Sequence, residues 1–133
     1  MKYRIELTET QLNLIMKALE RFFRTNMGQF AEYTDDVAFE DFTYDKSNPE
    51  NSQRFDIRID RRNVAQDLMK QAYRVMKPEP RECSEDTRRA IDIFDTFRYA
   101  LWDWKPEPKD HNTVESRKPL PFIDEELPKI ERI

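Results

Sequence analysis

Glycine is almost absent from this chain of 133 residues, which contains only Gly28. Glycine-rich phosphate loops, dinucleotide-binding fingerprints and nucleophile elbows each need at least two glycines, so these sites are excluded. One cysteine and one histidine exclude a disulfide framework and a Cys/His zinc site. No apolar run approaches 18 residues, and no charged segment leads into an apolar one. We therefore expect a soluble, unprocessed, cytoplasmic protein with no membrane partner.

Aromatic and charged residues are plentiful instead. Nine Phe, five Tyr and two Trp argue against global disorder and for a packed core. The net charge of −4 and the pI near 5.2 argue against a duplex-DNA binder. Residues 29–50 hold seven acidic groups against Lys46 alone, which is too short a run for the long acidic face of a DNA mimic. This charge balance does not exclude a local pocket for a small anion.

Two segments have clear helical periodicity. A capping box, Thr8 with Gln11, precedes a helix over about residues 9–26, and Gly28 lies just past its end. A second helix, over about 85–103, begins after Ser84 and is apolar around most of its circumference. Such a helix is central or shared between subunits, so we expect a homodimer or higher oligomer. Shorter helices are expected over 29–36 and 61–77.

Three segments alternate between apolar and polar residues, as half-buried strands do. They are residues 2–8, 39–45 and 53–59, the last two joined by a polar turn containing Pro49. The predicted fold is therefore α+β: a small antiparallel sheet of about three strands packed with three to four helices. Residues 1–104 are expected to form a single domain. Residues 105–133, which hold five of the eight prolines, are expected to form an extended arm packed on the body or on a neighbouring subunit.

Two motifs resemble a protein family. The first runs Leu7-Thr8-x-x-Gln11-Leu12-x-Leu14-Ile15-x-x-Ala18-Leu19-Glu20, followed by Arg24 and Met27-Gly28-Gln29-Phe30. The second is Ala90-x-Asp92-Ile93 followed by Phe97-Arg98-x-x-Leu101-Trp102-Asp103; the tail adds Pro119-Leu120 and Leu127-Pro128-Lys129-Ile130-Glu131. About half of the chain thus resembles a family of small uncharacterised phage and prophage proteins, while residues 32–60 and the segment before Ser84 depart from it. The resemblance implies an accessory role in an infected bacterial cell. Because the family is uncharacterised, no catalytic or binding residue carries over from it.

Arginines form the most suggestive group of candidate binding residues. Several lie near expected helix starts, where free N–H groups also attract anions, and one lies among aromatics in the late helix. Arginine beside aromatic rings is what a nucleotide pocket needs, whereas internal ion pairs with nearby Asp and Glu are the simpler explanation. The candidate ligand-binding residues are Arg58, Arg61, Arg62, Arg88, Arg89, Arg98 and Trp102.

A catalytic site and a metal site have weaker support in the sequence. A nucleophilic pair of Cys83 and His111 would need the two side chains adjacent and a third group to orient them. The acidic pairs Asp35/Asp36, Glu40/Asp41 and Glu85/Asp86 lack the spacing of a known metal loop. We therefore expect no metal, no cofactor and no enzymatic activity.

The sequence thus predicts a non-enzymatic phage or prophage accessory protein. The leading hypothesis is an anti-defence role, in which an arginine and aromatic pocket sequesters a nucleotide immune signal. The alternative hypothesis is a protein-interaction module that inhibits or redirects a host protein.

Overall fold

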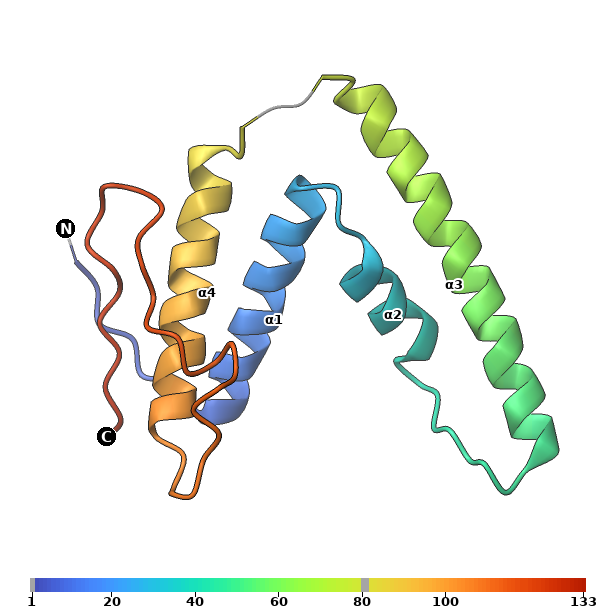
Figure 1. Cartoon of the computed structure of the whole chain (residues 1–133), viewed down its shortest axis with the longest axis horizontal. Helices are drawn as coiled ribbons and strands as arrows, with labels where there is room; N and C mark the ends of the chain where they lie inside the picture. The colour runs from blue at the N-terminus through green and yellow to red at the C-terminus, as the bar shows by residue number, and fades with distance from the viewer. Residues whose placement is uncertain (1, 80–81) are drawn as a thin grey trace. The chain divides into compact units, whose positions relative to one another are not determined.

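The computed structural model describes residues 2–79 and 82–133, and every regular element in that part of the chain is an α-helix (Figure 1). These helices are α1 (Glu9–Asn26), α2 (Ala31–Phe39), α3 (Pro49–Met76) and α4 (Glu85–Asp103). No strand occurs among the described residues. The prediction of an α+β fold with a small antiparallel sheet is therefore wrong, and this portion of the chain is all-helical.

The two strongly periodic helices begin where their caps predict. The Thr8 hydroxyl accepts from the Gln11 amide at 3.2 Å, and the Gln11 side chain accepts from the Thr8 amide at 2.9 Å, so the capping box forms. At α4 the Ser84 hydroxyl accepts from the Thr87 amide at 3.2 Å. The predicted helices over 9–26 and 85–103 are confirmed.

The predicted strand over 53–59 is instead part of α3, a helix of 28 residues. The Asn48 side chain accepts from the Glu50 and Asn51 amides, and Pro49 opens the first turn, where its missing N–H costs nothing. The alternation of Phe55 and Ile57 reflects two apolar sides of one helix, because two residues turn a helix by about 200°. The predicted helix over 61–77 is the later part of α3.

The other predicted strands also lack any ladder. Residues 2–8 remain irregular, with Tyr3 81% and Ile5 75% exposed. Most of the 39–45 segment is a loop after α2, and its aromatic residues contact α3 rather than a neighbouring strand. The ring centroids of Phe42 and Tyr44 lie 5.8 Å and 4.6 Å from that of Phe55. The apolar residues of this segment thus pack as a loop-to-helix cluster.

The chain divides into two compact units. Unit 1 comprises Met1–Phe23 and Cys83–Ile133, and unit 2 comprises Arg24–Glu82. In unit 1, α1 and α4 lie side by side, and the Phe23 ring meets the Phe94 ring edge-on at 5.4 Å (Figure 1). The buried apolar residues of unit 1 are Leu12, Phe23, Ala90, Ala100 and Trp102. The predicted limits of 1–104 for one domain and 105–133 for its arm stay a prediction.

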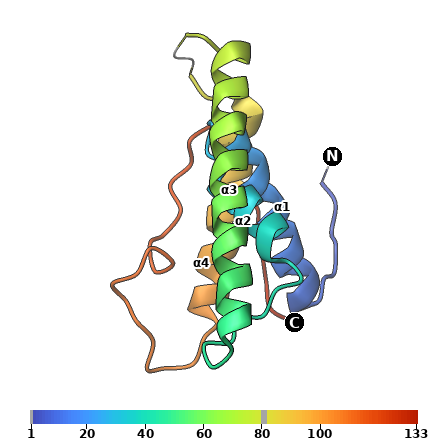
Figure 2. The same cartoon turned by 90° about the vertical axis from the view of Figure 1, so that its right-hand side faces the viewer.

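The C-terminal tail, residues 105–133, has no helix or strand and returns along α4 within unit 1 (Figure 2). Near the end of α4, the Trp102 indole N–H donates to the Asp110 carbonyl at 2.9 Å. Further back, the Asp92 carboxylate accepts from the Phe122 amide at 2.9 Å. The tail therefore covers part of the apolar circumference of α4 that the sequence predicts to be shared between subunits.

In unit 2, α2 packs along α3. Phe30, which is 3% exposed, meets the Tyr73 ring edge-on at 5.9 Å. Gly28 precedes this contact with a φ of 75°, and a Cβ there would lie 2.8 Å from Tyr73 Cε1. The Tyr73 hydroxyl donates to the Asn26 carbonyl at 2.9 Å, which holds the ring against the glycine. The one glycine of the chain is thus required by both backbone conformation and close approach.

Candidate functional site

Two of the three candidate arginines on α3 bind carboxylates of unit 2. Arg58 Nη1 lies 2.9 Å from Asp41 Oδ1 and donates to the Ala38 carbonyl at 2.7 Å, and its guanidinium lies 5.0 Å from the Phe42 ring centroid. The hydrogen bond from Arg58 holds the pKa of Asp41 below its usual value. These contacts fasten the loop after α2 onto α3.

Arg62 has a comparable role one turn further along α3. Its Nη1 lies 2.7 Å from Asp35 Oδ1 on α2, and its Nε and Nη2 donate to Asn63 Oδ1. Arg61, between the two paired arginines, is exposed. The three residues thus do not converge on a common space, because Arg58 and Arg62 face α2 and its loop.

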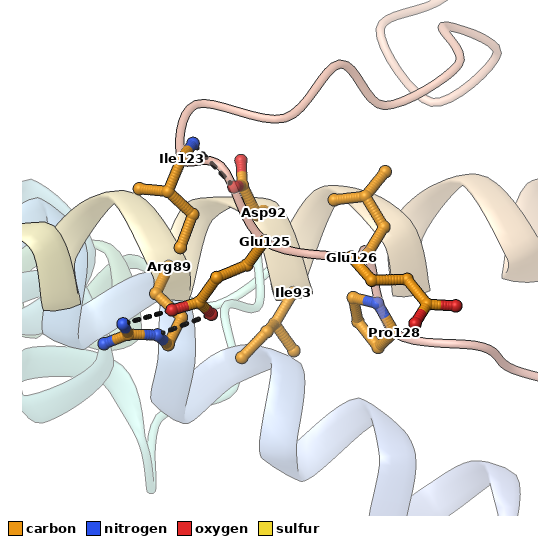
Figure 3. Close-up of a pocket in the computed structure, with 8 residues that line it drawn as sticks. Arg89, Asp92, Ile93, Ile123, Glu125, Glu126 and Pro128 are labelled. Atoms are coloured by element: carbon orange, nitrogen blue, oxygen red, sulfur yellow. Dashed lines mark hydrogen bonds and ion pairs between the residues drawn. The ribbon is translucent and has the colours of Figure 1, made fainter.

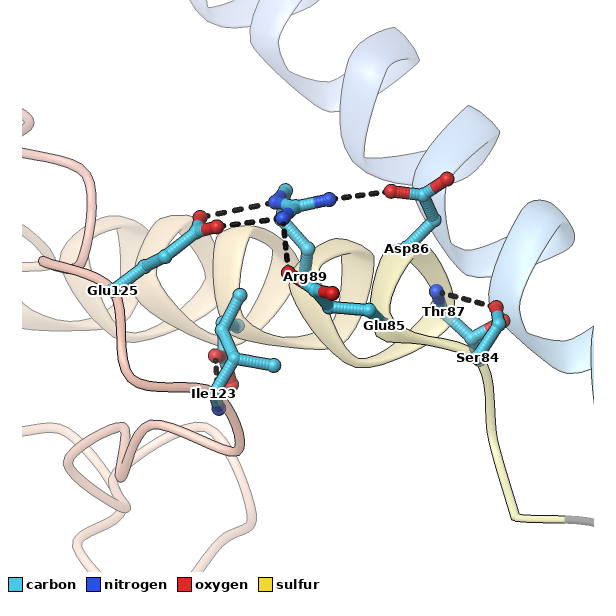
Figure 4. Close-up of polar contacts among 8 residues, drawn as sticks. Ser84, Glu85, Asp86, Thr87, Arg89, Ile123 and Glu125 are labelled. Carbon is cyan, nitrogen blue, oxygen red and sulfur yellow. Dashed lines mark hydrogen bonds and ion pairs between the residues drawn. The ribbon is translucent and has the colours of Figure 1, made fainter.

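Arg89 on α4 is surrounded by acidic side chains. Its Nε and Nη2 donate to the Glu125 carboxylate at 3.0 Å and 2.6 Å, and further contacts reach Glu85 at 2.8 Å and Asp86 (Figure 4). The hydrogen bond from Arg89 lowers the pKa of Glu125, and the same bond raises the pKa of Arg89. A guanidinium with three carboxylates has a surplus of negative charge around it, which opposes the binding of an anion.

Arg88 and Arg98 each have a buried Nε that donates to no acceptor among the described residues. Arg98 Nη2 lies 3.2 Å from Asp95 Oδ1, and its guanidinium lies 5.9 Å from the Phe94 ring centroid. Burial raises the pKa of Asp95, and the charge of Arg98 opposes that rise. Arg98 therefore has the internal partner that the simpler sequence interpretation requires.

Trp102 is 8% exposed and contacts the tail rather than an open space. Lys109 Nζ lies 4.4 Å from its ring centroid, and the His111 ring meets it edge-on at 5.1 Å. The aromatic surface that a nucleotide base would need is thus covered by the chain's own tail.

Cys83 is half-buried and lies just before α4, where the second part of unit 1 begins. No cluster of three metal-ligating side chains occurs in the parts of the chain that the structure describes.

A small cavity lies where the tail crosses the first half of α4 (Figure 3). Its volume is about 180 Å³, below the roughly 300 Å³ at which ligand pockets usually begin. Beside it, Asp92 is 4% exposed, and its carboxylate accepts from the backbone amides of Phe122 and Ile123. The residues that line the cavity are Arg89, Asp92, Ile93, Ile123, Glu125, Glu126, Leu127 and Pro128. This arrangement is suited to holding the tail on α4.

The largest feature missed by the sequence analysis is an exposed apolar line on α3. We call it the α3 stripe and define it as Ile57, Arg61, Val64, Leu68, Gln71 and Val75. Its apolar members Ile57, Val64, Leu68 and Val75 are 43%, 60%, 60% and 82% exposed. The stripe lies on the side of α3 opposite Phe55, which faces the loop after α2. Its signal in the sequence is the spacing of seven, four and seven residues between the apolar members.

No described helix has the length and apolar character needed to cross a membrane. Comparison of the chain with family models, with curated proteins and with solved structures finds no match.

Proposed function

We propose that this chain is a non-enzymatic protein-interaction module that binds its partner through the α3 stripe. The exposure of Ile57, Val64, Leu68 and Val75 along one side of a long helix is the observation that supports this most directly. A helix with apolar residues on two opposite sides needs two neighbours to bury them, and α2 with its loop supplies only one. The resemblance to phage and prophage proteins supports an accessory role in an infected cell.

The competing proposal, sequestration of a nucleotide, has less support. Of its candidate residues, Arg58, Arg62, Arg89 and Arg98 each have a carboxylate partner within the chain. A bound phosphate would have to displace those carboxylates, at the cost of leaving their charges unpaired. The nucleotide pocket stays a prediction.

Site-specific photocrosslinking tests the proposed function. A photoreactive phenylalanine analogue is placed at Val64 on the stripe, with a matched control at Asp56, which is exposed on the same helix about 100° away from the stripe. Crosslinking in cells that express the chain is expected to give protein adducts at position 64 and none at position 56. Equal yields at both positions, or no adduct at either, would contradict the proposal.

A thermal-shift screen with linear and cyclic nucleotides separates the two functions. We expect no stabilisation by any nucleotide. A stabilisation that disappears in the Arg98→Ala variant would favour the nucleotide pocket instead.

A further inference from the structure

We propose that the partner bound by the α3 stripe is the α3 stripe of a second copy of this chain, with the two helices antiparallel. This inference rests on the proposed function and names its partner. Three features support it: the spacing of the stripe, the residues that each orientation would bring together, and the charges that flank the stripe.

The spacing of the stripe matches a helix-to-helix seam. From Ile57 to Val75 its members follow at intervals of four, three, four, three and four residues. A repeat that alternates four and three residues averages 3.5, which is the spacing at which two helices keep one seam facing each other. The stripe spans about 27 Å at a rise of 1.5 Å per residue. Its length is that of a short coiled coil rather than of a single local contact.

An antiparallel pairing places apolar residues opposite apolar residues in one register. Val64 lies opposite Leu68 of the second copy, and Ile57 lies opposite Val75 of the second copy. Arg61 then lies opposite Gln71 of the second copy, which can accept a hydrogen bond from it. A parallel pairing would instead set Arg61 against Arg61 of the second copy. Like charges within a seam are unfavourable, so the antiparallel orientation is preferred.

The charges beside the stripe support the same orientation. In the antiparallel register, Asp60 lies next to Arg74 of the second copy, and the two-fold symmetry forms this pair twice. Both residues are exposed, and neither has an ion pair within residues 2–79 and 82–133. Asp67 meets Asp67 of the second copy at the centre, which is one unfavourable pair. Ala65 lies on the other flank and leaves room for close approach.

The helix that the sequence favours for dimerisation is less suitable. α4 buries Ala90, Ala100 and Trp102 within unit 1. Trp102 contacts the C-terminal tail, and Phe94 of the same helix contacts Phe23 of α1. The apolar side chains of the α3 stripe are far more exposed than these. The burial of these side chains thus favours α3, rather than α4, as the helix of the dimer interface.

Sedimentation equilibrium of the full chain tests whether the protein is a dimer in solution. The wild-type chain of 16.2 kDa is expected at about 32 kDa at micromolar concentration. Leu68→Asp, whose helix content is checked by circular dichroism, is expected at the monomer mass. The matched control is Leu14→Asp on α1, where the leucine is 68% exposed, and it is expected to remain a dimer. A monomeric wild type, or a dimer that survives Leu68→Asp, overturns the inference.

Charge exchange tests the orientation. Arg74→Asp and Asp60→Arg are each expected to weaken the dimer roughly tenfold, and the double variant is expected to restore it. Asp67→Asn is expected to strengthen the dimer, because it removes the central repulsion. Failure of the double variant to restore the dimer overturns the antiparallel pairing.

Sedimentation and photocrosslinking together separate this inference from the proposed function. A wild-type chain that is monomeric, but whose photoreactive residue at position 64 still crosslinks to another protein, overturns only this inference. The absence of all crosslinked adducts overturns the proposed function as well.

Discussion

Replacing Asp92 with alanine is expected to release the C-terminal tail from α4. The carboxylate is 4% exposed, and its two oxygens accept from the Phe122 amide at 2.9 Å and 3.1 Å. Oδ2 also accepts from the Ile123 amide at 3.3 Å. The variant leaves both backbone donors without an acceptor at a place where the tail covers the helix. The tail must then either bury unpaired N–H groups or move into water.

The size of the effect follows from these bonds. A hydrogen bond to a charged group contributes about 1.5–3 kcal/mol, and a donor released into water recovers part of that loss. We therefore expect Asp92→Ala to lower the free energy of unfolding of unit 1 by about 2–4 kcal/mol. With a denaturant slope of about 2 kcal/mol per molar urea, the midpoint falls by about 1–2 M. Asp92→Asn keeps one acceptor oxygen and should lose less.

Tryptophan fluorescence is the appropriate assay, because Trp102 and Trp104 both lie in unit 1. Urea titrations of the wild type and of Asp92→Ala give the two midpoints. Limited proteolysis reports whether residues 105–133 become accessible. The control is Glu6→Ala, which removes an exposed carboxylate from the irregular N-terminal segment of unit 1. An unchanged midpoint together with an unchanged rate of tail cleavage would refute the role assigned to Asp92.

Three further predictions concern other contacts. Lys2 and Lys129 lower the pKa of Glu126 from 4.5 to about 2, so the contribution of these ion pairs is complete above pH 4.5 and is lost as the pH falls toward 2; Lys2→Ala should raise that pKa, as measured by NMR titration. Gly28→Ala should destabilise unit 2 by about 1–3 kcal/mol, measured as faster amide exchange in α3, because both the φ of 75° and the tethered ring of Tyr73 oppose a Cβ. Arg98→Ala should cost about 1–3 kcal/mol in urea titrations, since it leaves a half-buried carboxylate without its partner, and an unchanged midpoint would show that the pair contributes nothing.

The two helices with clear caps and a long apolar pattern, α1 and α4, could be predicted from the sequence. Thr8 with Gln11, and Ser84, fix where α1 and α4 begin, and each helix has a 3.6-residue pattern long enough to exclude a strand. In these cases the local hydrogen bonds and the burial of the apolar face favour the same structure.

α3 could not be identified as a whole by the same approach. Its apolar residues lie on two opposite sides, so that seven residues around Phe55 and Ile57 imitate the alternation of a strand. The deciding signal is the helix start at Asn48 and Pro49, but the sequence pattern also fits a turn, because both residue types are common in turns. Without that helix, the three-strand sheet was the remaining way to bury the aromatics of residues 39–59.

The ion pairs of the candidate arginines show a second limit of prediction from the sequence. Their nearness to helix starts and aromatics is visible in the sequence, and so are acidic partners three or four residues away, such as Asp95 for Arg98. The partners that lie far away in the sequence are not visible. Arg58 bonds to Asp41 through a turn of the chain, and Arg89 bonds to Glu125 from the distant tail. A carboxylate that far away in sequence is brought close only by the packing of loops and tail, which periodicity does not encode.

The order of the two units along the chain has a consequence for synthesis on the ribosome. Unit 2 is continuous in sequence, whereas the two parts of unit 1 lie on either side of it. Phe23 leaves the ribosome well before Phe94, and the intervening residues 24–82 take several seconds to make at about 5–20 residues per second. Unit 2 can therefore fold before α4 has been synthesised and before α4 can cover the apolar face of α1. The nascent chain passes through a stage in which one unit is complete and the first helix of the other is open to chaperones or to misassembly.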